Sequence, residues 1–230
     1  VDRYKPGIIA INRNGVRFTN EAQSYHDFGK AMLKDAGGDA PFAWLLCDSR
    51  AISKYGLGYV KPFPVPHGQH VRSGYLRKAS TLTELARKIE VPGDALERTV
   101  ADYNRFARQG EDPAFGKGST QYNRFLGDAD HPVDPCNAPL ETPPFFAVRV
   151  VMGDLGTFGG LKTDSKGAVL RSDGSVIRGL FAVGNDMASI MGGEYPGGGI
   201  TLGPAMTFGY IIGRELTAAT QSRKPAGGMN

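Results

Sequence analysis

The segment from Gly193 to Leu216 constrains this chain more than any other part of it, because glycine-rich backbone there runs directly into a helical pattern. Pro196 sets a turn just after Tyr195, and three glycines follow before apolar residues recur at the spacing of one helix face. Backbone without side chains lets a flat or anionic ligand approach the amides at a helix N-terminus, where the helix dipole favours negative charge. The segment therefore predicts a ligand site at the start of the last helix, with the Tyr195 hydroxyl as a further donor. A glycine-rich loop that only caps a buried helix is the alternative.

The composition sets the class of protein. Glycine accounts for 32 of the 230 residues, about twice its usual share, which favours backbone lying close to ligands. Hydrophobic residues make up 40% and charged residues 22% of the chain, which is enough apolar material for a globular core. The net charge of +4 comes from scattered Lys and Arg without a basic run, so nucleic-acid binding has little support. No apolar stretch reaches the length of a membrane span, and we expect a cytoplasmic protein without a transmembrane segment.

The residues that most often bind metals are few and poorly arranged. Cys47 and Cys136 are far apart in the sequence and have no metal-like spacing, so reduced thiols are expected. His67 and His70 lie close together, but among prolines and without a supporting carboxylate or cysteine cluster. We therefore predict no metal site.

The residues just before the glycine-rich segment form another informative pattern. Residues 179–186, Gly-Leu-Phe-Ala-Val-Gly-Asn-Asp, indicate a short buried strand that ends in glycine and polar side chains. With the segment that follows, this stretch resembles the C-terminal end of FAD-dependent enzymes of the fumarate reductase and 3-ketosteroid dehydrogenase superfamily. The run Tyr-Pro-Gly-Gly-Gly over 195–199 is similar to the 3-ketosteroid delta-1-dehydrogenase branch, whereas the fumarate reductase branch tends to carry His-Gly-x-Asn-Arg-Leu-Gly-Gly there.

This resemblance implies FAD as the cofactor. The end of the strand would bring polar residues to the flavin, and the last helix would point its N-terminus at the pyrimidine end of the flavin. The cofactor-binding residues implied in this way are Gly184, Asn185, Asp186, Thr201 and Leu202. Phe158 and Gly159 are expected to close the substrate pocket where a cap domain meets the flavin domain.

A stretch near the start of the chain carries the same resemblance. Residues 7–21, Gly-Ile-Ile-Ala-Ile-Asn-Arg-Asn-Gly-Val-Arg-Phe-Thr-Asn-Glu, are similar to the core G-x-[IL]-x-[VI]-N-x-x-G-x-R-F-x-N-E of the superfamily. Tyr25 follows four residues later, which resembles the ketosteroid dehydrogenase branch. The resemblance implies that Tyr25 is the base that abstracts a proton, and that the Tyr195 hydroxyl and the Gly199 amide are a donor pair. A third tyrosine of that family, which supports the base, would lie outside this chain.

These implied roles agree with the needs of the chemistry. Removing hydrogen from two adjacent carbons beside a ketone requires donors for the developing enolate oxygen, a base for the α-proton and an acceptor for hydride. FAD would be the acceptor, because no side chain accepts hydride. A phenol is a demanding base, since its ordinary pKa of about 10 leaves little phenolate at pH 7. A tyrosine that only packs at a helix start is therefore the alternative for Tyr25.

The fold class predicted from these patterns is α+β, in two parts. Residues 1–154 would form a substrate or cap domain, residues 155–220 the C-terminal segment of an FAD-binding domain, and residues 221–230 a tail. A dinucleotide-binding domain needs G-x-G-x-x-G between a strand and a helix, and this spacing occurs nowhere in the chain. We therefore expect that the N-terminal Rossmann half of the flavin domain is missing and is a partner of this chain. The chain alone would bind FAD weakly or not at all.

Local signals predict the individual elements. The Asn14-Gly15 turn between apolar runs predicts a hairpin over 8–18. A helix is expected to start at Ser24, and two capping boxes predict further helix starts at Thr81 and Asp94. Long irregular stretches are expected at 54–74 and 111–144. Strands are expected at 42–47, 145–151, 161–163, 168–170, 175–177 and 180–183. The last helix is expected to open near Thr201 or Pro204, with an apolar face made of Leu202, Ala205, Met206, Tyr210 and Ile211.

Three functions remain open at this point. The first is part of a flavin-dependent dehydrogenase that introduces a C=C bond beside the ketone of a hydrophobic, steroid-like cyclic substrate. The second is a fumarate-reductase-type enzyme that reduces a C=C bond beside a carboxylate. That reaction needs an arginine acid and cationic clamps, for which Arg17 and Arg149 are available. The third is a fragment that folds but performs no redox chemistry.

Overall fold

The chain folds into two compact units. The computed structural model describes residues 2–221, and the side chains of 219–221 are not described. The first unit ends at Met152 and the second begins at Gly153, two residues before the division expected from the sequence. The assignment of the units to a cap domain and a flavin-domain segment stays a prediction. The expected tail, 221–230, lies outside the described residues except for Gln221, which ends the last helix.

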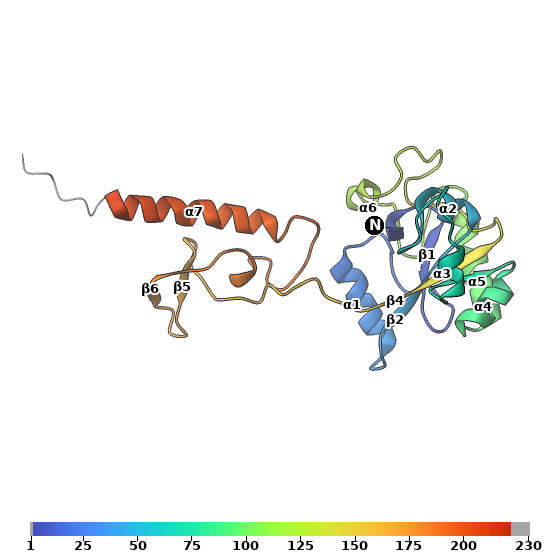
Figure 1. Ribbon diagram of the computed structural model, residues 1–230, viewed down its shortest axis with the longest axis horizontal. Helices are drawn as coiled ribbons and strands as arrows, with labels where there is room; N and C mark the ends of the chain where they lie inside the picture. The colour runs from blue at the N-terminus through green and yellow to red at the C-terminus, as the bar shows by residue number, and fades with distance from the viewer. Residues whose placement is uncertain (1, 222–230) are drawn as a thin grey trace, which may run out of the picture. The chain divides into compact units, whose positions relative to one another are not determined.

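A four-stranded antiparallel sheet forms the centre of the first unit (Figure 1). Its strands, in spatial order, are β1 (Ile8–Ile11), β2 (Phe42–Cys47), β4 (Phe145–Val151) and β3 (Leu76–Ala79). β1 pairs with β2 along its whole length, and β2 pairs with β4 in the same way. The strands expected at 42–47 and 145–151 are therefore confirmed.

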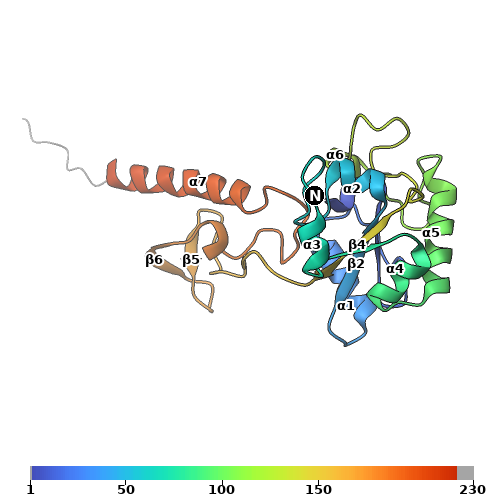
Figure 2. The same cartoon turned by 45° about the vertical axis from the view of Figure 1, so that its right-hand side comes forward.

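Helices cover both faces of this sheet (Figure 2). Ile9 and Ile11 of β1 pack with α4 (Leu82–Ile89) and α5 (Gly93–Ala107) on one face. Ile8 and Ala10 pack with α1 (Tyr25–Ala36) and α2 (Ser49–Tyr55) on the other. Alternate residues of a strand point to opposite faces, so a strand that is covered on both sides is apolar throughout. This explains the uninterrupted apolar run of β1.

The expected hairpin is wrong in its second strand. The turn exists, because the Asn12 side chain accepts hydrogen bonds from the amides of Asn14 and Val16, at 3.0 and 3.1 Å, and Gly15 has a φ of 74°. Residues 16–18 then leave the sheet instead of pairing with β1. The partner of β1 is β2, about 30 residues further along, because that pairing lets helices bury both faces of β1.

The two predicted capping boxes have different outcomes. Thr81 caps α4 as expected, accepting from the Glu84 amide at 3.1 Å. Asp94 is not the cap of α5, which begins at Gly93 with Pro92 in the capping position. The Pro92 carbonyl accepts the first helical hydrogen bond, from Leu96 at 3.1 Å. Asp94 therefore lies inside the first turn, where the helix dipole still favours its charge.

Short helices interrupt two stretches that were expected to be irregular. They are α3 (Gly68–Arg72) and α6 (Gln121–Phe125). A 3₁₀ turn, η1 (Asp2–Tyr4), precedes β1.

No helix among residues 2–221 combines the length and the apolar character needed to cross a membrane.

The second unit is smaller and rich in turns. It contains β5 (Ala168–Leu170) paired with β6 (Val176–Phe181), the 3₁₀ turn η2 (Gly184–Asp186) and the long helix α7 (Leu202–Gln221). β6 joins the two strands expected at 175–177 and 180–183, while residues 161–163 form only isolated bridges. Its core is small, and apolar side chains of α7 are largely exposed: Leu202 by 69%, Met206 by 74% and Tyr210 by 68%.

Candidate active site

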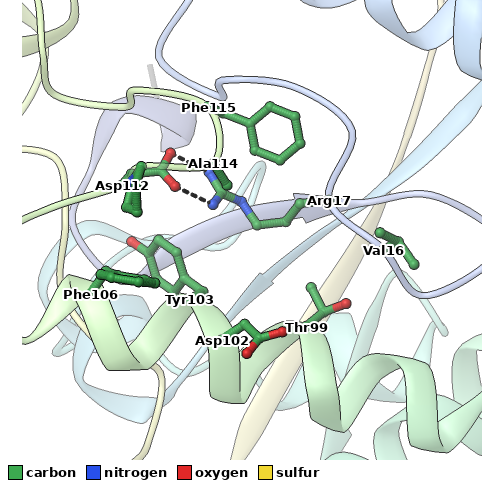
Figure 3. Close-up of a pocket in the computed structure, with 10 residues that line it drawn as sticks. Val16, Arg17, Thr99, Asp102, Tyr103, Phe106, Asp112, Ala114 and Phe115 are labelled. Atoms are coloured by element: carbon green, nitrogen blue, oxygen red, sulfur yellow. Dashed lines mark hydrogen bonds and ion pairs between the residues drawn. The ribbon is translucent and has the colours of Figure 1, made fainter.

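Arg17 turns into the interior of the first unit after the chain leaves the sheet. Its guanidinium donates to both carboxylate oxygens of Asp112, at 2.7 and 2.9 Å. Figure 3 shows this pair at the wall of a cavity of about 240 Å³. The cavity is also lined by Val16, Thr99, Asp102, Tyr103, Phe106 and Phe115. Arg17 and Asp112 are both buried, so the charges compensate each other away from water.

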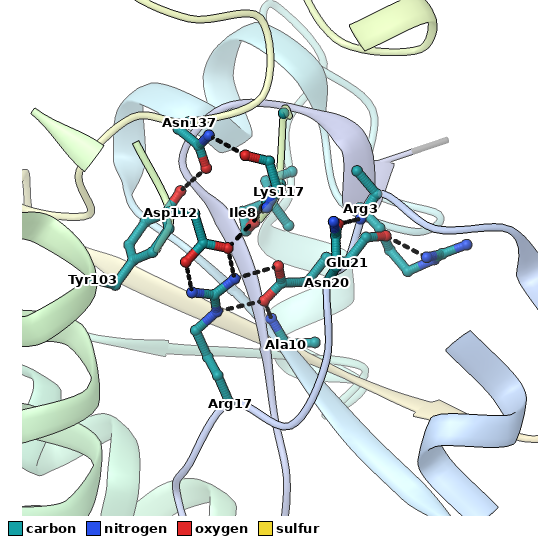
Figure 4. Close-up of polar contacts among 12 residues, drawn as sticks. Arg3, Ile8, Ala10, Arg17, Asn20, Glu21, Tyr103, Asp112, Lys117 and Asn137 are labelled. Carbon is teal, nitrogen blue, oxygen red and sulfur yellow. Dashed lines mark hydrogen bonds and ion pairs between the residues drawn. The ribbon is translucent and has the colours of Figure 1, made fainter. Parts of the chain in front are cut away.

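Glu21 completes a buried ionic network with this pair (Figure 4). The Nε and Nη2 atoms of Arg17 donate to the two oxygens of Glu21, at 2.8 and 2.7 Å. Burial alone would raise the pKa of each carboxyl, but the Arg17 guanidinium outweighs burial and holds the pKa of Glu21 and of Asp112 below its usual range. Because Nε, Nη1 and Nη2 of Arg17 all bind carboxylates of the protein, Arg17 is not free to clamp a carboxylate substrate.

Amide side chains fix the loop that follows. Asn20 accepts a hydrogen bond from the Ala22 amide at 2.8 Å and donates to Asn123 at 3.0 Å. Asn123 in turn donates to the Ala22 carbonyl at 2.7 Å. Glu21 also accepts from the amide of Ala10 in β1, at 3.0 Å. The Arg-Phe-x-Asn-Glu segment therefore ties the loop before α1 to the sheet and to α6.

Tyr25 begins α1 directly after this loop. Ser24 caps the helix, accepting from the Asp27 amide at 3.1 Å, and Gly37 ends it in the left-handed conformation. The helix start expected at Ser24 is therefore confirmed. Tyr25 is 54% exposed, whereas Ser24 and Phe28 beside it are buried. The hydrogen-bonded loop thus leaves the Tyr25 side chain accessible at the start of the helix.

Several residues of this network carry no signal in the sequence. Asp112, Lys117 and Asn123 all lie in the stretch 111–144 that was expected to be irregular. The ammonium of Lys117 is buried and donates to the Ile8 carbonyl at 2.6 Å. Burial lowers the pKa of Lys117. No sequence pattern linked these residues to Arg17 or Glu21, because the contacts join distant parts of the chain.

Glu21→Gln is expected to destabilise the first unit by about 3–5 kcal/mol, because it leaves part of a buried guanidinium uncompensated. Since the pKa values of Glu21 and Asp112 are lowered by folding, their contribution is full above pH about 4–5, the ordinary range of carboxyls, and is lost as the pH falls further. Urea unfolding of the chain at pH 7 and at pH 3.5 measures both effects. The matched control is Asp39→Asn, which removes the exposed partner of Arg13 and should change the midpoint little. A Glu21→Gln midpoint equal to that of the control would contradict the role of the network.

In the second unit, the residues expected to bind the flavin lie together. Gly184, Asn185 and Asp186 form η2, which packs against α7. A Cβ at Gly184 would come within 3.3 Å of the Ala205 side chain, and its φ of 65° also suits glycine. η2 therefore lies tightly against the first turn of the last helix.

Phe158 and Gly159 lie beside the segment that follows η2. The Phe158 carbonyl accepts from the Ser189 amide at 3.1 Å, and Gly159 bridges to Ala188. The next residue, Gly160, approaches so closely that a Cβ there would lie 2.1 Å from the Asp186 carbonyl oxygen. Glycine is thus required at 160 by the backbone of η2.

The glycine-rich run leads into α7 as expected, and the helix begins at Leu202. Gly199 has a φ of 98°, and its carbonyl accepts from the Gly203 amide at 2.7 Å. Thr201 and Leu202 stand at the helix start, where backbone amides have no carbonyl four residues before them within the helix. Tyr195 is half-buried four residues before Gly199.

The structure thus gathers the expected flavin-binding residues and the expected pocket residues in the second unit. The expected donor pair, Tyr195 and Gly199, belongs to the same unit, and the expected base, Tyr25, belongs to the first. Their catalytic and binding roles stay predictions.

A comparison with known families decides the family of the chain. The model of a family described as "FAD binding domain" matches residues 1–202. This chain belongs to that FAD-binding family. Its mixed helix and sheet architecture matches part of flavoprotein structures of the 3-ketosteroid dehydrogenase and fumarate reductase type.

The individual relatives are dehydrogenases and reductases. A 4-oxocyclohex-2-ene-1-carboxylate 5-dehydrogenase of Sinomonas cyclohexanicum is 48% identical over 97% of this chain and 38% of its own length. The crystal structure of the 3-ketosteroid delta1-dehydrogenase from Sterolibacterium denitrificans, in complex with 1,4-androstadiene-3,17-dione, is 39% identical with a TM-score of 0.86, over 95% of this chain and 40% of that one. An open flavocytochrome c3 fumarate reductase is 27% identical with a TM-score of 0.54, over 92% of this chain and 32% of that one. The chain therefore spans about two fifths or less of the length of these proteins.

The residues at the start of α7 fit one end of the flavin. A Cβ at Gly198 or at Gly199 would meet nothing within 4 Å, so the backbone there borders open space. The adjoining helix N-terminus supplies amide donors and a positive dipole end, which suit the carbonyl oxygens of an isoalloxazine ring. A phosphate-binding G-x-G-x-x-G loop does not occur in the 230 residues.

Proposed function

We propose that this chain is the substrate-binding and C-terminal part of an FAD-dependent dehydrogenase that introduces a C=C bond next to the ketone of a cyclic substrate. The observation that carries the proposal is the accessible Tyr25 phenol, held at the first residue of α1 by a buried polar network. The glycine-rich segment between Tyr195 and α7 supports it, because that segment combines a phenolic donor with backbone amides. Membership of the FAD-binding family supplies the cofactor class.

In this proposal each residue has one role. The Tyr25 oxygen takes the proton from the carbon next to the ketone. The Tyr195 hydroxyl and the Gly199 amide donate hydrogen bonds to the ketone oxygen and stabilise the enolate that forms. FAD, when bound, supplies the acceptor for the hydride of the neighbouring carbon. The loss of one proton and one hydride leaves the C=C bond.

The flavin would be held by the second unit. Gly184, Asn185 and Asp186 would face the ribityl or pyrimidine part, and the amides of Thr201 and Leu202 would donate to the pyrimidine carbonyl. Phe158 and Gly159 would close the substrate pocket. The exposed apolar face of α7 supports a further partner, which we propose to be the N-terminal half of the flavin domain.

The isolated 230-residue chain is expected to retain little or no FAD, because the pyrophosphate and the adenosine find no dinucleotide-binding loop in it. Gel filtration of the chain after incubation with FAD, with visible absorbance of the protein peak, measures retention. The longer protein that carries the N-terminal half is the positive control. A stoichiometric yellow peak from the chain alone would contradict this expectation.

The substrate class separates the candidate reactions. Related dehydrogenases are named for a 3-ketosteroid and for a monocyclic oxocyclohexene carboxylate. We therefore propose that the substrate is a cyclic ketone, and a hydrophobic, steroid-like ketone is our first candidate. The test is anaerobic reduction of the flavin in the full-length protein by a 3-oxosteroid and by 4-oxocyclohexanecarboxylate, beside oxidation of the reduced flavin by fumarate. Reduction by either ketone supports the proposal, and the faster one names the ring system.

Two results would overturn it. Rapid oxidation by fumarate without reduction by ketones would favour the fumarate-reductase-type reaction, against which the engagement of Arg17 with Glu21 and Asp112 argues. No redox response to any of the three compounds in a flavin-loaded protein would favour a non-catalytic role.

A further inference from the structure

Arg3 is a buried cation that the proposed chemistry has not yet used. It is only 7% exposed. Its Nη1 atom donates to the carbonyl oxygens of Glu21, in a short contact, and of Gln23, at 3.3 Å. Its Nη2 atom is buried and has no hydrogen-bond partner in the described part of the chain. Burying a guanidinium N–H without a hydrogen-bond partner costs free energy, and buried polar groups in folded proteins normally have a partner. Arg3 is therefore a candidate for a role beyond packing.

Aromatic rings surround this guanidinium. Its central carbon lies 4.4 Å from the ring centroid of Phe28, 5.4 Å from that of Tyr4 and 5.6 Å from that of Tyr25. Burial lowers the pKa of Arg3, and the nearby tyrosines and Glu21 offset part of that effect. Among residues 2–221 no carboxylate forms an ion pair with Arg3, because the carboxylate of Glu21 binds Arg17.

Tyr4 and Tyr25, the two tyrosines whose rings lie against Arg3, differ in exposure. Tyr4 is buried, and its hydroxyl donates to the Gln23 carbonyl at 2.8 Å and lies 3.3 Å from the Tyr122 hydroxyl. Burial raises the pKa of Tyr4, which keeps it a neutral phenol. Tyr25 is 54% exposed and stands at the helix start that the Arg3 contacts support.

We infer that Arg3 is a positioning residue for Tyr25, which holds the loop before α1 in place and stabilises the phenolate form of Tyr25 by its positive charge. Figure 4 shows Arg3 beside the loop that carries Asn20 and Glu21. This loop leads through Ser24 to Tyr25, so the two hydrogen bonds of Nη1 hold the backbone that directly precedes Tyr25. The inference rests on the proposed function, in which Tyr25 is the base.

The charged and titratable groups on the elements packed against Tyr25 include a cation over its ring, Arg3. From η1 come Arg3 and the neutral Tyr4, and from α6 comes the Tyr122 hydroxyl. The loop contributes Glu21, whose charge is compensated by Arg17. On α1 itself, Asp27 accepts a hydrogen bond from Ser24, and His26 and Lys30 are the other titratable side chains of the first two turns.

The first test is the pH dependence of flavin reduction by a ketone substrate in single turnover, with the full-length, flavin-loaded protein. In Arg3→Gln the rate at pH 7 should fall about tenfold, and the rise of the rate with pH should move up by about one unit toward an unchanged plateau. Arg3→Lys keeps the charge, so its pH profile should stay close to that of the wild type. Arg13→Gln, which removes an exposed arginine of the same unit, is the control and should leave the profile unchanged.

The second test observes Tyr25 without turnover. With 3-fluorotyrosine incorporated, the ¹⁹F resonance that is missing from Tyr25→Phe belongs to Tyr25, and its titration midpoint should rise by about one unit in Arg3→Gln. An unchanged midpoint, or a rate that falls equally at every pH, would overturn the inference. If Arg3→Gln does not fold, Arg3→Lys decides, because a midpoint that moves a full unit with the charge kept would overturn it too.

The two proposals can fail separately. A normal rate of flavin reduction in Tyr25→Phe removes the proposed base, while a shifted Tyr25 midpoint in Arg3→Gln still supports the electrostatic coupling. If Tyr25→Phe loses flavin reduction and the Tyr25 midpoint is unshifted in Arg3→Gln, Tyr25 remains the proposed base and the role inferred for Arg3 is wrong.

Discussion

Tyr25→Phe in the flavin-loaded, full-length protein is expected to slow flavin reduction by a ketone substrate by about a thousandfold, the usual range for the loss of a positioned general base. The substitution removes one oxygen and keeps the ring. Ser24 still caps α1 and the Arg17–Glu21–Asp112 network stays intact, so the free energy of unfolding should change little. Stopped-flow measurement of flavin absorbance under anaerobic conditions gives the rate, and urea unfolding gives the stability.

Tyr59→Phe is the matched control for that experiment. Tyr59 is also an exposed tyrosine of the first unit, with 79% of its surface accessible. The Tyr59→Phe variant should reduce its flavin at the wild-type rate. If Tyr25→Phe reduced its flavin as fast as this control, Tyr25 would be a packing residue. The base would then have to come from another part of the full-length protein.

The second large effect is expected at the donor pair. Tyr195→Phe should lower the turnover number about a hundredfold or more while the flavin content stays normal, because one hydrogen bond to the developing enolate oxygen is lost and the half-buried ring remains. A loss confined to the turnover number, with little change in KM, identifies a contact made in the transition state. Near-normal turnover with a 3-oxo substrate would make Tyr195 structural.

Hydrogen exchange into the substrate separates the two tyrosines. Incubation of a ketone substrate with the oxidised protein in D₂O measures abstraction of the α-proton directly. Tyr25→Phe should lose this exchange almost completely, since no base remains. Tyr195→Phe should retain a slow exchange, since the base is present but its enolate product is less stable. Equal exchange in both variants would contradict the division of roles.

Some features of this protein follow from short stretches of sequence alone. The start of α1 at Ser24, its end at Gly37 and the cap of α4 at Thr81 are local, because each depends on hydrogen bonds between residues a few positions apart. The glycine-rich run before α7 is of the same kind. The family likewise follows from two contiguous segments, near Arg17 and near Tyr195.

Other features depended on residues that are distant in the sequence. The Asn14-Gly15 turn formed, yet β1 paired with β2, since strand pairing is chosen by which faces can be buried.

The environment of Tyr25 was also decided by tertiary structure. Arg17 meets Asp112 across 95 positions, and Asn20 meets Asn123 across 103. Arg3 reaches the ring of Tyr25 only through the fold of the intervening loop. The sequence by itself determined which residue types were available and the family they belong to. Only the tertiary structure decided which charges lie next to the phenol, because burial and electrostatic interaction depend on distance in space and not on distance along the chain.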